Sequence, residues 1–288
     1  MIIDDLKATY QNSPVITPAY IRNALKETLQ YYLLQYISLS PLSENLIFKG
    51  GACLRIFFDL PRLSDDLDFD WTGTEKFDIE NFALSIKKYF SSSLQFNAIE
   101  TKVDANSQTI YVKFPVLDLV GLPLTPSDSN SLDVRLDITP VMGSEFTTEP
   151  AFKSTRDFSF VLTRYSLPDL MAGKIAAILT RNAEDGQVQE TQVRGKDYYD
   201  LIWFLEKGVV PNWTYLRQLT ELSREKAMEE IHTKIVNINE RSLQTELGPY
   251  FSNPSFVQAF SKNLLNLYNQ FVPQLLSETK INSSLSVT

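Results

Sequence analysis

The stretch RLSDDLDFDW, residues 62–71, alternates polar and apolar side chains from Leu63 to Trp71 and therefore predicts a β-strand. Successive side chains of a strand point to opposite faces, so one set would enter a core. The other set is polar and consists of Ser64 and the three aspartates Asp66, Asp68 and Asp70. Carboxylates spaced about 7 Å apart on one face repel each other, and a divalent cation removes that repulsion. Asp66 and Asp68 are therefore candidate metal ligands.

A solvated acidic edge strand is the alternative interpretation, since charges on an edge prevent pairing with other chains. Two features favour the metal site: the aspartates flank large apolar residues, and they closely follow Gly50 and Gly51. These glycines lie between an apolar run at 46–48 and a predicted helix at 52–59. Glycine lets the backbone approach a ligand, and backbone N–H groups at a helix N-terminus can bind phosphate. Paired glycines also occur in purely structural turns, so phosphate binding is a hypothesis.

A further strand, predicted at 132–139, carries additional candidate carboxylates. Asp133, Arg135 and Asp137 share one face of this strand. We favour Asp137 because it lies between apolar residues at the end of the strand. It would complete the metal shell with Asp66 and Asp68, or act as general base toward an acceptor hydroxyl. The alternative is a surface ion pair with Arg135, which contributes little.

The predicted elements describe an α+β protein: a mixed sheet with flanking helices, followed by a C-terminal helical domain. A helix is expected at 18–40 and another at 77–91, and further strands at 94–103 and 108–116. The pattern becomes helical from Ser166 onwards. We expect a catalytic α/β domain at 1–160 and a helical domain at 161–288 that completes the active site.

The composition restricts the chemistry. One cysteine, Cys53, and one histidine exclude an intrachain disulfide and a zinc site of the usual type, so a metal would be held by carboxylates, as Mg²⁺ or Mn²⁺. We interpret Cys53 as a core residue. No apolar run reaches the roughly 18 residues of a membrane span, and a reducing, cytoplasmic location fits. A net charge of −8 disfavours general nucleic-acid binding.

The helical half contains a second set of candidates. Lys174 interrupts an apolar helix and would either contact a triphosphate or extend to solvent. Asp197 and Asp200 share one face of a helix predicted at 196–207. The helix dipole favours acidic residues in the first turn, which accounts for one of the two but not obviously for both. The densest basic stretch near the predicted site is the preferred docking place for a triphosphate or an acceptor RNA, and consists of Arg164, Lys174, Arg181, Arg194 and Lys196.

Two segments carry a resemblance to a known family. GGACLR at 50–55, followed by RLSDDLDF at 62–69, resembles the signature of the AbiEii/AbiGii toxins. These are nucleotidyltransferases of the DNA polymerase β superfamily and serve as toxins of type IV toxin–antitoxin systems. The segment at 194–200 is similar to the family's late Lys/Arg-Asp-x-x-Asp-Leu motif. Together with the two earlier segments, it extends the resemblance over roughly residues 45–205.

The resemblance implies a role for each matching position. Gly50 and Gly51 match the phosphate-binding turn, and the aspartates at 66 and 68 match the metal-binding pair. The remaining nucleotide-binding candidates are Arg62, Ser64, Lys174, Lys196, Asp197 and Asp200, of which Lys174 is also a catalytic candidate. Ala52 departs from family members that carry Thr or Ser after the glycines, which leaves phosphate binding there to the backbone.

The predicted function is the metal-dependent transfer of a nucleoside monophosphate from an NTP to an acceptor. The resemblance to MenT-type toxins implies the tRNA 3′ end as acceptor and a cognate antitoxin encoded nearby. An acidic surface fits a small molecule or a protein hydroxyl better than tRNA, so both acceptor classes stand. A non-catalytic NTP-binding protein is a third hypothesis, and the intact pair of Asp66 and Asp68 argues against it.

Overall fold

The computed structural model describes residues 1–13, 17–122, 129–180, 194–273 and 275. The chain forms two compact units. The first comprises Met1–Val141 and Thr148–Tyr165, and the second comprises Met142–Thr147 and Ser166–Thr288. Arg181 of the predicted basic stretch and the polar C-terminal residues 277–288 lie outside the described residues.

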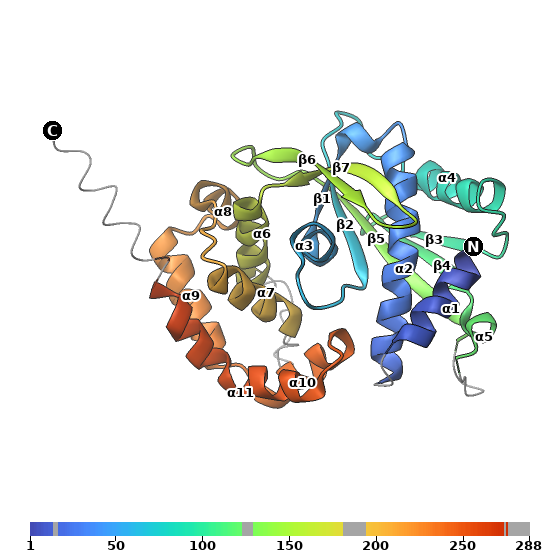
Figure 1. Ribbon diagram of the computed structural model, residues 1–288. Coiled ribbons are helices and arrows are strands. Elements are labelled where there is room, and N and C mark those ends of the chain that lie inside the picture. Colours follow the sequence, from blue (N-terminus) through green and yellow to red (C-terminus); the bar gives the residue numbers. More distant parts are fainter. Residues whose placement is uncertain (14–16, 123–128, 181–193, 274, 276–288) are drawn as a thin grey trace. The chain divides into compact units, whose positions relative to one another are not determined.

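The first unit contains a seven-stranded sheet with the order β3-β4-β5-β2-β1-β7-β6 (Figure 1). The strands are β1 (Leu46–Lys49), β2 (Asp66–Trp71), β3 (Glu100–Asp104), β4 (Thr109–Pro115), β5 (Ser131–Pro140), β6 (Thr148–Ser154) and β7 (Ser159–Tyr165). The central strand β2 runs parallel to β5 and antiparallel to β1, and β1 runs parallel to β7. The other neighbours are antiparallel. This mixed sheet with flanking helices confirms the predicted α+β fold.

Helices of the first unit cover the apolar face of this sheet. They are α1 (Ile2–Asn12), α2 (Pro18–Leu39), α3 (Gly50–Phe58), α4 (Ile79–Ser92) and the short α5 (Leu117–Val120), with a 3₁₀ turn at Ser43–Asn45. Phe69 of β2 stacks on Phe48 of β1, and Phe57 of α3 packs edge-on against Phe48. Phe90 of α4 packs in the same way against Phe114 of β4. These contacts leave the opposite face of β2 to its aspartates.

The second unit is helical apart from its linking segments. Its helices are α6 (Leu167–Thr180), α7 (Gly195–Glu206), α8 (Trp213–Thr220), α9 (Arg224–Val236), α10 (Glu240–Leu247) and α11 (Pro254–Phe271), with a 3₁₀ turn at Gly248–Tyr250. The buried Asp169 fixes the start of α6. Its carboxylate accepts hydrogen bonds from the Thr147 amide at 2.9 Å and from the Asn212 side chain at 2.7 Å. It also accepts a bond from the Ser166 hydroxyl, which confirms the predicted helix start there.

Some predicted elements differ from the observed ones. β6, β7 and α1 were not predicted, and β3 begins at Glu100 rather than at residue 94. β2 begins at Asp66, because residues 63–65 form an irregular connection after α3. Across the described ranges, no helix combines the length with the hydropathy that a membrane span needs.

Candidate functional site

The strand β2 presents two half-buried aspartates on one face. Asp66 and Asp68 alternate with Leu67 and Phe69, which are fully buried. The predicted alternation is therefore confirmed from Asp66 to Phe69, whereas Asp70 is buried although it is polar. Both carboxylates lie on the face opposite the helices described above, so the strand separates a core side from a carboxylate side.

The glycine turn packs directly against this strand. Gly50 has a φ of +78°, a conformation that L-residues rarely adopt, and a Cβ there would lie 2.0 Å from the Oδ2 of Asp68. A Cβ on Gly51 would lie 2.5 Å from the Nη2 of Arg62 and 3.0 Å from the Oγ of Ser64. A Cβ at either position would have to displace a neighbouring side chain, so the turn at the start of α3 packs closely against Asp68 of β2 and against Arg62 and Ser64 before it.

Arg62 is buried inside this arrangement. Its side chain is only 1% exposed, and its Nη1 donates a 2.8 Å hydrogen bond to the Leu63 carbonyl. The guanidinium lies beside Gly51, so Arg62 packs against the glycine turn. The role of Arg62 in nucleotide binding stays a prediction.

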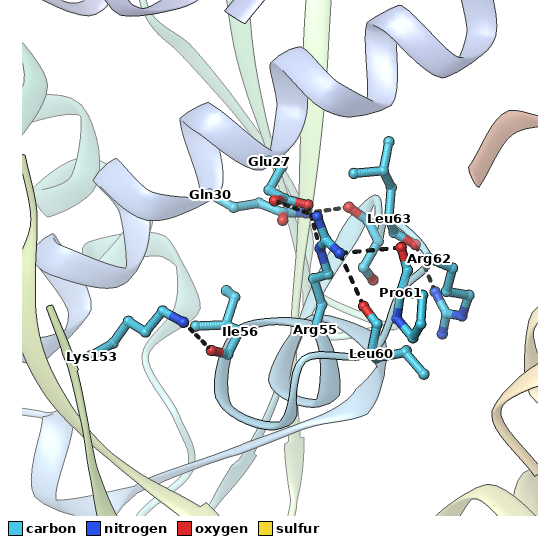
Figure 2. A network of polar contacts seen from close by, with 10 residues as sticks. Glu27, Gln30, Arg55, Ile56, Leu60, Pro61, Arg62, Leu63 and Lys153 are labelled. Carbon is cyan, nitrogen blue, oxygen red and sulfur yellow. Dashed lines mark hydrogen bonds and ion pairs between the residues drawn. The ribbon is translucent and has the colours of Figure 1, made fainter. Parts of the chain in front are cut away.

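A network of polar contacts fixes the connection between α3 and β2. Figure 2 shows its residues, which are Glu27, Gln30, Arg55, Ile56, Leu60, Pro61, Arg62, Leu63 and Lys153. The guanidinium of Arg55 donates to Glu27 at 3.0 and 3.3 Å and to the carbonyl oxygens of residues 60 and 61 at 3.1 Å. Gln30 donates to the buried Ser64 carbonyl at 3.0 Å. Helix α2 therefore holds the segment that leads into the aspartate strand.

The neighbouring strand β5 brings Asp137 beside Asp68. The two residues are partners in the parallel register of β2 and β5, whereas Asp133 lies beyond the start of β2. The carboxylate of Asp137 forms an ion pair with Arg135 at 2.8 Å and accepts a 2.6 Å hydrogen bond from Thr109. The position fits the predicted third carboxylate, and the ion pair fits the alternative interpretation. Partial burial opposes the charge of Arg135, but Asp137 raises the pKa of its guanidinium above the ordinary value.

The donor set at this face suits a hard divalent cation. Asp66 and Asp68 supply carboxylate oxygens two residues apart, and Mg²⁺ is commonly held by one or two carboxylates together with substrate phosphates. Within the described ranges, no group of three or more His, Cys, Asp or Glu side chains is arranged to hold a metal ion. The fit therefore depends on the aspartate pair, with the remaining ligands expected from a nucleotide and from water.

The third aspartate of β2, Asp70, is bound by protein donors. It is buried, and its Oδ1 accepts hydrogen bonds from Lys49 at 2.6 Å and from Thr139 at 2.8 Å. Its Oδ2 accepts a 2.6 Å bond from the hydroxyl of Tyr165. No local sequence pattern indicates Lys49, Thr139 or Tyr165, because only the sheet register brings them to Asp70.

The candidates of the second unit form a cluster of their own. The amine of Lys174 lies 2.9 Å from Asp197 and 2.9 Å from Asp200, and all three side chains are buried or nearly so. One ammonium between two carboxylates leaves a net charge of −1 if all three groups are ionised. The amine of Lys196 lies 4.6 Å above the ring of Tyr250, as a cation–π contact. The predicted pair Asp197 and Asp200 therefore has a shared partner in Lys174.

Cys53 lies in the core, as predicted. Its side chain is fully buried in α3, and this burial raises the pKa of the thiol well above its ordinary value. A thiolate nucleophile needs the opposite shift. Cys53 therefore contributes packing rather than nucleophilic chemistry.

Comparisons with solved structures give proteins of the same fold. MenT4, a nucleotidyltransferase toxin from Mycobacterium tuberculosis H37Rv, has a similar fold, with 14% sequence identity, a TM-score of 0.50, and coverage of 93% of this chain and 89% of that one. JHP933 from Helicobacter pylori is also similar, with 14% identity, a TM-score of 0.52, and coverage of 94% and 99%.

These structural likenesses show the fold, whereas the family is established by a match of the sequence to a family model. No curated protein matches the chain. The family model described as "Nucleotidyl transferase AbiEii toxin, Type IV TA system" matches residues 32–281, which is most of the chain. The chain therefore belongs to the AbiEii family of nucleotidyltransferase toxins.

Proposed function

We propose that this transferase moves a nucleoside monophosphate from an NTP to an acceptor hydroxyl, with Mg²⁺ or Mn²⁺ held by Asp66 and Asp68. The observation that carries the proposal is the aspartate pair on one face of β2, with Asp68 packed against Gly50. When bound, the cation would neutralise phosphate charge and stabilise the attacking and leaving oxygens.

The chain's own residues would orient the nucleotide. The backbone N–H groups at the start of α3 are suited to bind phosphate, because a helix N-terminus carries unpaired donors and partial positive charge. Gly51 is buried, and the absence of its side chain leaves room for the Arg62 guanidinium and the Ser64 hydroxyl beside the turn. Asp137 would complete the metal shell or accept the proton of the acceptor hydroxyl, and either role requires Arg135 to release it.

The roles of the second-unit residues rest on the family match. We propose that Lys174 contacts the nucleotide and that Asp197 and Asp200 hold its amine when no nucleotide is present. Lys196 is proposed as a further nucleotide contact. As a point charge on a flexible stem, Lys174 can exchange carboxylate partners for phosphate oxygens.

We propose the tRNA 3′ end as the acceptor, as the resemblance to MenT-type toxins implies. We propose a cognate antitoxin as the partner, since the family model describes a type IV toxin. The net charge of −8 supports a second candidate, a small molecule or a protein hydroxyl. An acidic protein binds polyanions weakly unless a local basic surface compensates.

The test is transfer of label from each α-³²P NTP, with Mg²⁺, to total tRNA, to proteins and to small hydroxyl compounds. Asp66→Asn and Asp68→Asn keep the side-chain shape and remove the charge, so we expect each to lower transfer by at least about 100-fold. The exposed Asp157→Asn is the matched control and should transfer at the wild-type rate.

Each outcome bears on the proposal. Label on tRNA that disappears in both variants supports the tRNA acceptor, and label on another compound class supports the second candidate. Near-wild-type transfer by either variant with intact circular dichroism would contradict the metal site on β2.

A further inference from the structure

We propose that Lys49, Asp70, Thr139 and Tyr165 form a positioning network that holds the glycine turn and the aspartate pair in a fixed relation. None of these residues would contact the reacting atoms. The inference rests on the proposed metal site at Asp66 and Asp68, and it adds positioning residues to it.

The network is centred on one buried carboxylate. Lys49 and Thr139 donate to the Oδ1 of Asp70 at 2.6 and 2.8 Å, and Tyr165 donates to its Oδ2 at 2.6 Å. Lys49 also donates to the Thr139 hydroxyl at 3.0 Å. Charged and neutral donors thus occupy both oxygens of Asp70, as a buried carboxylate requires.

Each member lies on a different strand. Lys49 ends β1, Asp70 lies in β2, Thr139 lies near the end of β5 and Tyr165 ends β7. These four strands are neighbours in the sheet, in the order β5-β2-β1-β7. One side chain therefore connects all strands around the candidate site.

The network is adjacent to the proposed site in the chain on both sides. Lys49 immediately precedes Gly50 and is the register partner of Asp68, while Asp70 follows Asp68 by two residues on the same face. The bond from Lys49 to Asp70 therefore ties the glycine turn to the metal strand. Displacements of about 1 Å in a reactive site can lower rates about 100-fold, so such a tie is functionally valuable.

Two other roles for Asp70 make different predictions. As a purely structural group, it would affect stability without affecting the folded site. As a metal ligand, it would be needed for metal binding itself, so a folded Asp70→Asn protein would not bind the ion. Hydrogen bonds that can be removed one at a time, from Thr139 and from Tyr165, distinguish a purely structural role from positioning, and Asp70→Asn distinguishes a metal ligand.

The experiment measures Mn²⁺ affinity by calorimetry in the presence of a non-hydrolysable NTP analogue, together with the melting temperature. Thr139→Val and Tyr165→Phe each remove one hydroxyl and keep the side-chain bulk. We expect both to weaken Mn²⁺ affinity by about three- to tenfold, corresponding to about one lost hydrogen bond. Thr139→Ser retains the hydroxyl and should bind Mn²⁺ like the wild type.

The outcomes separate cleanly. Unchanged Mn²⁺ affinity in Thr139→Val and Tyr165→Phe, with lower melting temperatures, would overturn the proposal in favour of a structural role. Abolished rather than weakened Mn²⁺ binding in a folded Asp70→Asn protein would overturn it in favour of a metal ligand. Absence of transfer by the wild type would contradict the proposed function alone, because the binding measurement does not depend on transfer.

Discussion

Asp68 occupies the space that a side chain on Gly50 would need: a Cβ there would lie 2.0 Å from the Oδ2 of Asp68. Gly50→Ala must therefore displace the carboxylate, and it must also adopt a φ of +78°, which costs roughly 1–2 kcal/mol for an L-residue. We expect loss of nucleotide transfer and a lower free energy of unfolding, measured by urea denaturation.

Gly248→Ala is the matched control for that substitution. Its φ is −49°, and an added Cβ would meet no atom within 4 Å. Stability and transfer should stay close to wild type. Full transfer by Gly50→Ala would mean that Asp68 does not work from its observed position.

The ion pair between Arg135 and Asp137 provides a second prediction. If Asp137 completes a metal shell, Arg135→Gln should strengthen Mg²⁺ binding, because the guanidinium no longer competes for the carboxylate. Asp137→Asn should weaken Mg²⁺ binding. The half-exposed pair should contribute no more than about 1 kcal/mol to stability. The rate of nucleotide transfer, measured as a function of Mg²⁺ concentration, distinguishes these effects. If both variants need the same Mg²⁺ concentration as the wild type, Asp137 serves only the ion pair.

The buried cluster around Lys174 provides a third prediction. Lys174→Met leaves Asp197 and Asp200 without their shared cation, and breaking a buried pair costs roughly 3–5 kcal/mol. The triple variant Lys174→Met/Asp197→Asn/Asp200→Asn removes all three charges and should recover most of that stability. Urea denaturation of both proteins measures the difference. If the single variant is as stable as wild type, the cluster does not stabilise the helical unit.

Alkaline pH should destabilise the protein. Burial raises the pKa values of Tyr32 and Tyr268 above 10.0 and that of Cys53 above 9.0. The unfolded chain therefore loses these protons first, so their stabilising effect is complete below about pH 9 and is lost as the pH rises above it. We expect the free energy of unfolding to fall between about pH 9 and pH 11. Tyr268→Phe should make that fall shallower, and a constant free energy across the range would contradict the prediction.

Much of the candidate site could be predicted from local pattern. The alternation around Asp66 and Asp68 has the period of a strand, and the glycines mark the turn before α3. The capping residue Thr17, whose hydroxyl accepts from the Tyr20 amide at 3.1 Å, likewise marks the start of α2. These signals are strong because each arises within a few consecutive residues.

Other features depend on distant parts of the chain and were missed. β6 contains Pro150 and exposes most of its side chains, so it resembles a loop although it forms a sheet edge. β7 exposes Val161 beside it. Arg62 has a charge that suggests a surface position, and only the packing of Gly51 shows that it is buried. The donors to Asp70 come from residues 49, 139 and 165, a combination that no local pattern indicates.

The four-strand connection through Asp70 also has a consequence for synthesis of the chain. Its last member, Tyr165, belongs to the strand that completes the β5-β2-β1-β7 centre of the sheet. A growing chain contains the glycine turn and the aspartate pair long before it contains β7, and such distant contacts form late because loop closure must precede them. A ribosome-bound fragment that ends before residue 165 would therefore contain the glycine turn and the aspartate pair without the strand that completes the sheet around them. A truncated toxin of that length would be inactive.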